Sequence, residues 1–135
     1  VIGGALSESG VASLMICREG SGRSRRFRRK DRRELDLAVR DGLTWLQEHF
    51  SVEENPGREA AFHHHYYLYG LERAAMLARR RWIGTHDWYR EGADYLLAQK
   101  HPRDAWGGHV PTSFAILFLK RATAGPRDAP TVTGR

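Results

Sequence analysis

Residues 40–46, Arg40-Asp41-Gly42-Leu43-Thr44-Trp45-Leu46, recur fifty positions later as residues 90–96, Arg90-Glu91-Gly92-Ala93-Asp94-Tyr95-Leu96. A second element repeats at nearly the same interval, because residues 68–74 (LYGLERA) reappear as residues 116–122 (ILFLKRA). Residues 11–18 form a third, more diverged copy of this element. Two elements that alternate at this period are typical of helical hairpins that stack side by side. We therefore predict an all-α fold.

The spacing of apolar residues predicts five helices. The expected ranges are 8–17, 31–50, 61–79, 87–99 and a last helix that begins at Pro111. The second and fourth are amphipathic, whereas the other three are apolar almost throughout and must be covered on all sides. This pattern predicts antiparallel helical hairpins with alternating inner and outer helices, which form half of a closed or curved double layer. Residues 1–125 would form it, and residues 126–135 would be a disordered tail.

Composition narrows the possible classes of protein. A chain of 135 residues fits one domain, and a single cysteine, Cys17, excludes an internal disulfide. No apolar run is long enough to span a bilayer. The chain begins with Val, and a helical stack needs further repeats or caps at its ends. We therefore expect a piece of a longer protein, and the compartment, cytoplasmic or exported, stays open.

The positive charge is concentrated in residues 18–33. This segment has nine Arg or Lys against two acidic residues, a net charge of +7, so the rest of the chain nets −1 from the total of +6. One interpretation is contact with nucleic acid or an anionic membrane; the other is a flexible, solvated loop between helices. Only Phe27 interrupts the charges, so aromatic rings for base stacking are missing. We expect a basic loop and no nucleic-acid partner.

The alternating helices resemble the α/α toroid of squalene and terpenoid cyclases and of protein prenyltransferases, over about residues 5–123. Residues 88–99 resemble an outer helix of such a repeat, and residues 111–119 the inner helix that follows it. Residues 66–74 resemble inner helices of bacterial proteins with this repeat. From the end of segment 88–99 to the start of segment 111–119, the chain resembles the Gln-to-Trp motif that ties neighbouring repeats together in this family. The matching residues are Gln99, Trp106 and Gly107, and Asp104 stands where the family usually has Gly.

The resemblance implies an apolar, isoprenoid-type ligand, held where the N-termini of the inner helices converge. The Asp-rich acid motif of the cyclases is absent, since His63-His64-His65 and Pro111-Thr112-Ser113 stand at the inner-helix starts. The Asp, Cys and His zinc ligands of the prenyltransferases are absent too, because Cys17 lies mid-helix without a suitably spaced Asp. The chain could thus belong to an enzyme, or to a non-catalytic scaffold or protein-interaction module completed by further repeats or by self-association. We expect no cofactor.

Two inner helices supply the residues that we expect to line a cavity. They are His63, Tyr66, Tyr67, Tyr69, Glu72, Arg73, Thr112 and Ser113. Aromatic walls can stabilise a carbocation, but large aromatic side chains also pack simply between helices. Glu72 could act as an acid or pair with an arginine of an adjacent helix. Thr112 and Ser113 could favour an anion at a helix N-terminus or only cap the helix.

The three consecutive histidines raise the question of a metal site. Consecutive side chains on a helix point about 100° apart, so at most one of the three can face a given site. His86, His101 and His109 lie in other predicted loops and could converge with it. We expect no metal site, and we interpret the histidines as polar residues at a helix entrance.

Overall fold

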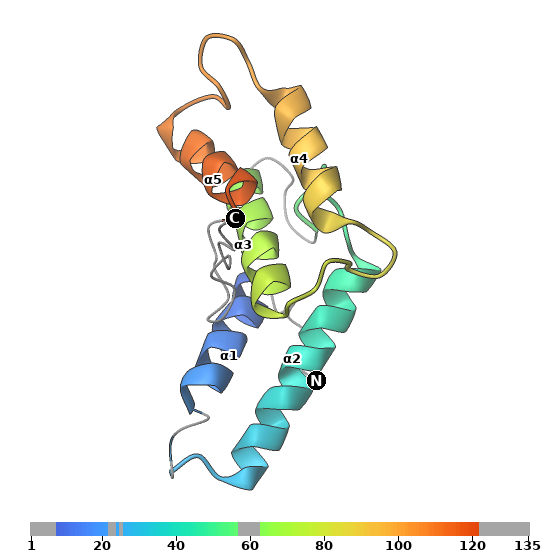
Figure 1. The fold of residues 1–135 in the computed structure, drawn as a ribbon, viewed down its shortest axis with the longest axis vertical. Helices are drawn as coiled ribbons and strands as arrows, with labels where there is room; N and C mark the ends of the chain where they lie inside the picture. The colour runs from blue at the N-terminus through green and yellow to red at the C-terminus, as the bar shows by residue number, and fades with distance from the viewer. Residues whose placement is uncertain (1–7, 22–23, 25, 57–62, 122–135) are drawn as a thin grey trace, which may run out of the picture.

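The computed structural model describes residues 8–21, 24, 26–56 and 63–121 of the chain, and these residues form five α-helices (Figure 1). The helices are α1 (Glu8–Ser21), α2 (Arg29–Glu48), α3 (His64–Leu77), α4 (Trp88–Gln99) and α5 (His109–Leu119). Within the described ranges the only β-type pairing is two isolated bridges, Ile83 with His86 and His101 with Ala105. The prediction of an all-α fold is confirmed. The expected tail, residues 126–135, lies outside the described residues.

The helix ends differ from the expected ones by a few residues. Helix α1 continues to Ser21 and α2 already begins at Arg29, so much of the basic segment 18–33 is helical rather than loop. Helix α5 begins at His109, two residues before the expected start at Pro111. Proline is tolerated there because the first N–H groups of a helix have no partner inside the helix.

Helix α3 is the centre of the molecule and packs against α1, α4 and α5. Helix α2 packs on α1, and α4 also contacts α5. In Figure 1 the chain runs in one direction through α1, α3 and α5 and in the opposite direction through α2 and α4. The residues that α3 buries are Tyr67, Leu68, Gly70, Leu71, Glu72, Ala74 and Ala75.

The repeated segment occupies equivalent places in α2 and α4. Gly42 and Leu46 are buried on α2, and the matching Gly92 and Leu96 are buried on α4. The same buried helix face thus occurs twice, with the leucine in the core in both copies, and Gly92 allows the close approach of Phe118.

Helix α5 is covered on one side only by the part of the chain that the structure describes. It buries Ala115 and Phe118, while Val110 and Ile116 are 66% and 44% exposed. On the neighbouring α4, Leu97 is 58% exposed. We had expected the fifth helix to be covered on all sides, and the described residues do not supply that cover.

Candidate functional site

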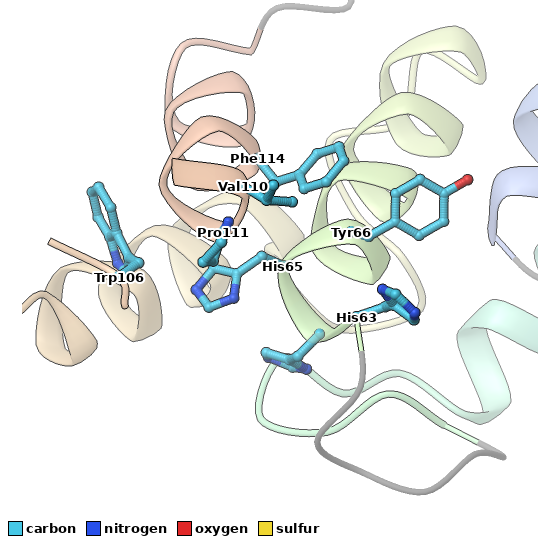
Figure 2. Close-up of a pocket in the computed structure, with 8 residues that line it drawn as sticks. His63, His65, Tyr66, Trp106, Val110, Pro111 and Phe114 are labelled. Carbon is cyan, nitrogen blue, oxygen red and sulfur yellow. The ribbon is translucent and has the colours of Figure 1, made fainter. Parts of the chain in front are cut away.

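A pocket of about 290 Å³ lies between the first turns of α3 and α5 (Figure 2). The N-terminal residues of both helices line the pocket, and Trp106 in the loop after α4 lines another side. The lining residues are His63, His64, His65, Tyr66, Trp106, Val110, Pro111 and Phe114. All three consecutive histidines line the pocket, so the expectation that at most one could face a given site is wrong here; His63 precedes the regular helix and has φ 70°. The wall is mainly aromatic and aliphatic, with the histidines as its polar part.

The apolar wall comes from ring contacts between the two helices. The rings of Tyr66 and Phe114 meet edge to face, with 5.4 Å between their centroids. The Phe114 ring also contacts the Tyr69 ring, with 5.5 Å between these centroids. Figure 2 shows Trp106 on the opposite side of the pocket from Tyr66 and Phe114. The indole Nε1 of Trp106 donates a hydrogen bond to the Leu96 carbonyl at 2.8 Å, which fixes the loop to the end of α4.

Two adjacent glycines bring the chain from Trp106 into α5. Gly107 has φ +82° and Gly108 has φ +134°, a region that side-chain-bearing residues rarely adopt. After this turn, Val110 and Phe114, which are four residues apart and so share a face of α5, both line the pocket. The two glycines therefore position the α5 half of the site.

His64 supplies a hydrogen-bond acceptor. Its Nε2 lies 2.9 Å from the Val52 carbonyl, which can only accept, so Nε2 carries the proton and Nδ1 is the bare nitrogen. Burial lowers the pKa of His64, and the bond to Val52 opposes this in part. Burial also lowers the pKa of His65, helped by the nearby His64. Both rings are therefore neutral near pH 7.

Each of these histidines keeps one buried nitrogen without a partner among the described residues. These atoms are Nδ1 of His64 and Nε2 of His65. Burying a polar atom without a hydrogen bond costs free energy, so such an atom calls for a ligand group or a water molecule. The pocket thus combines apolar walls with two histidine rings, each of which keeps a buried nitrogen unpaired among the described residues.

A second hollow of about 340 Å³ adjoins the first and shares His65 and Trp106 with it. The three residues that resemble the repeat-tying motif, Gln99, Trp106 and Gly107, all line this hollow. Trp106 bonds to the Leu96 carbonyl, while Gln99 is exposed. Tyr95 forms another wall, and burial together with the charge of Glu53 raises its pKa.

The structure separates the cavity candidates into two groups. His63 and Tyr66 line the pocket, and Tyr69 supports it through its contact with Phe114. Tyr67 is fully buried, and its hydroxyl donates to the Ser51 carbonyl at 2.9 Å, which places it in the core. Glu72 is also fully buried, and it is not a lining residue of the pocket.

The remaining candidates have local contacts. The Arg73 guanidinium lies 5.7 Å from the centroid of the Tyr69 ring. Ser113 donates from Oγ to the His109 carbonyl at 2.8 Å, and the Thr112 backbone N–H donates to the Gly108 carbonyl at 3.2 Å. None of these three side chains lines the pocket.

Sequence reasoning missed Val110 and Phe114 as lining residues. The sequence feature that could have indicated them is their spacing of four residues at the start of a helix that follows Trp106. Because the whole segment 114–119 is apolar, the sequence does not show which side faces a pocket.

The pocket's chemistry suits the binding of an apolar molecule with one polar group. Among the described residues, its lining has no carboxylate. In the described ranges, no group of three or more His, Cys, Asp or Glu side chains is placed to hold a metal ion.

None of the described helices combines the length and apolar character needed to cross a membrane. Comparison of the chain with known protein families, curated proteins and solved structures finds no match.

Proposed function

We propose that this chain is part of a bacterial α/α-toroid repeat protein similar to squalene cyclases and prenyltransferases, and that it binds an apolar, isoprenoid-type ligand. The observation that carries the proposal is the pocket between α3 and α5, where two helices that run in the same direction present their N-terminal ends (Figures 1 and 2). This is where the resemblance places a ligand.

The toroid part of the proposal is supported by the order of packing. Helix α3 lies between α1 and α5, and the repeated buried face of α2 recurs on α4. The exposed apolar residues Leu97, Val110 and Ile116 offer a surface for a further repeat. Repeats of this kind gain stability by covering the apolar face of their neighbours.

The ligand part of the proposal follows from the size and polarity of the pocket. At about 290 Å³ it is at the lower end of the range for small-molecule sites, so it would hold one end of an isoprenoid chain. The adjoining hollow, with which it shares His65 and Trp106, would take the next part. The polar end of the ligand would lie beside the histidine rings, which form the polar part of the lining.

The proposal assigns binding, rather than catalysis, to this chain's residues. Protonation of an alkene needs a carboxylic acid at the ligand, and Glu72 lies in the core away from the pocket lining. In a longer parent protein, catalytic groups would come from other repeats.

A farnesol analogue with a photoreactive diazirine tests the site. We expect the label on peptides that contain Tyr66, Val110 or Phe114, and we expect excess farnesol to compete with it. Labelling confined to peptides from α1 or α2, or labelling that farnesol does not reduce, would contradict the proposal.

A non-catalytic scaffold or protein-interaction module is the second candidate. The exposed Leu97, Val110 and Ile116 favour it, because apolar side chains on one edge of a helical stack suit contact with another chain. Light scattering at increasing concentration tests it. A self-association that Ile116→Asp abolishes, in a protein that does not bind farnesol, would support the scaffold over the ligand-binding module.

A further inference from the structure

A larger hollow of about 680 Å³ lies among the end of α3 with the loop after it, the first half of α4 and Arg121, the second residue after α5. It shares no lining residue with the pocket between α3 and α5. Five arginines from three separate segments converge on it: Arg79, Arg80 and Arg81 after α3, Arg90 on α4, and Arg121 after α5. We call this hollow the arginine groove.

The ends of α3 and α5 bring these arginines together. After α3, Arg79 adopts a left-handed conformation with φ 54°, and the Arg80 N–H donates to the Ala75 carbonyl at 2.9 Å. This pattern is the Schellman type of helix ending. Arg121 follows α5 with φ 47°, also left-handed. The Arg80 carbonyl accepts a bond of 2.7 Å from Trp88 Nε1, which ties the arginine-bearing loop to α4.

The arginine groove has an excess of positive charge. Two aspartates, Asp87 and Asp94, stand among the five arginines and leave a net charge of +3. Asp87 already caps α4, accepting from the Arg90 N–H at 3.2 Å, and its other oxygen lies 3.9 Å from Arg81 Nε. The negative charge of the Asp87 carboxylate is thus partly compensated by these two contacts. The excess guanidinium groups favour an anion in the groove.

The floor of the arginine groove is apolar. Ala75 and Trp88 are buried, and Met76 and Ala93 are half-buried beside them. The Tyr89 hydroxyl donates to the Leu119 carbonyl at 2.8 Å, and the Arg121 guanidinium lies 3.6 Å from the Tyr89 ring centroid. This cation–π contact holds Arg121 at the groove.

We propose that the arginine groove binds a small organic phosphate ester, with the phosphate among the arginines and the organic group on the floor beside Trp88. Guanidinium groups bind phosphate oxygens in a bidentate fashion, which suits a cluster of arginines better than one of lysines. A concave site admits a compact anion more readily than the long phosphate backbone of a nucleic acid.

Calorimetric titration with naphthyl phosphate at low ionic strength tests the proposal. We expect naphthyl phosphate to bind more tightly than inorganic phosphate, which lacks the organic group, and than naphthol, which lacks the charge. The double variant Arg79→Gln with Arg90→Gln should weaken binding by about tenfold or more, since it removes two guanidinium partners. Both side chains are exposed, so the fold should survive, which thermal unfolding checks.

The matched control removes the same charge elsewhere. Arg33 on α2 and Arg103 in the loop after α4 are exposed and lie outside the groove lining. The double variant Arg33→Gln with Arg103→Gln should bind naphthyl phosphate within about twofold of the wild type, because neither arginine lines the groove and neither guanidinium can contact the phosphate there. An equal loss in both double variants would overturn the proposal. So would a wild type that binds a DNA duplex through Arg79 and Arg90 but does not bind naphthyl phosphate.

Discussion

Gly92 of α4 lies directly against the ring of Phe118 of α5. A Cβ atom on Gly92 would overlap Phe118 Cζ and would stand 2.9 Å from Cε1, closer than such atoms approach in proteins. The fully buried Phe118 ring also stacks on Tyr89 and meets Trp88 edge to face, with centroids 5.9 Å and 5.8 Å apart. This contact fixes α5 on α4, and both the pocket and the arginine groove depend on that placement.

Gly92→Ala should therefore destabilise the protein. Overpacking a core costs about 1–3 kcal/mol, which exceeds the gain of up to about 1 kcal/mol from alanine in a helix. We expect urea unfolding to show a lower free energy of unfolding by about 1–2 kcal/mol. Gly20→Ala in α1 is the control, because no atom lies within 4 Å of its added Cβ, and it should be neutral or stabilising. Equal stability of the two variants would refute the close contact.

Trp106→Phe should destabilise the loop before α5. It removes the hydrogen bond to the Leu96 carbonyl, and we expect the free energy of unfolding to fall by about 1–2 kcal/mol. The exposed Gln99 should matter less, so Gln99→Ala should stay within about 0.5 kcal/mol of the wild type. Chemical denaturation measures both. A larger loss for Gln99→Ala than for Trp106→Phe would show that the loop is held by the glutamine instead.

Lowering the pH should reduce the free energy of unfolding, because His64 and His65 must take up protons. Their pKa values are lowered below the ordinary 6.5, so the unfolded chain binds more protons than the folded one as the pH falls through that value. Stability should be fully present above about pH 6.5 and should decline as the pH falls toward the lowered values. Unfolding curves at several pH values should show a flatter decline for His64→Gln and His65→Gln. Gln99→Ala, which changes an exposed residue that does not titrate, should keep the wild-type slope.

The sequence repeat predicted the fold class because its repeated positions form a buried helix face. Gly42 with Leu46 and Gly92 with Leu96 are the positions where that face meets the core, so their spacing survives in both copies. The helix ends were less predictable. Whether α1 stops at Cys17 or at Ser21 depends on a few exposed residues with similar preferences.

The sites depend on contacts that no short stretch of sequence contains. His63 and Tyr66 could be expected at the pocket from their place at a helix start. Phe114 could not be distinguished from its apolar neighbours, because its role is set by which side of α5 meets α3. The arginine groove was missed because Arg79, Arg90 and Arg121 belong to three separate segments and converge only through the packing of α3, α4 and α5.

Isothermal titration with farnesol tests the central proposal most directly. The wild type should bind farnesol, and Val110→Asp should weaken binding by about tenfold or more, since it places a charge in the apolar pocket. Leu97→Asp makes the same change at an exposed leucine that does not line the pocket, and it should bind as the wild type does. A wild type that does not bind farnesol, or equal losses in the two variants, would contradict a ligand site between α3 and α5.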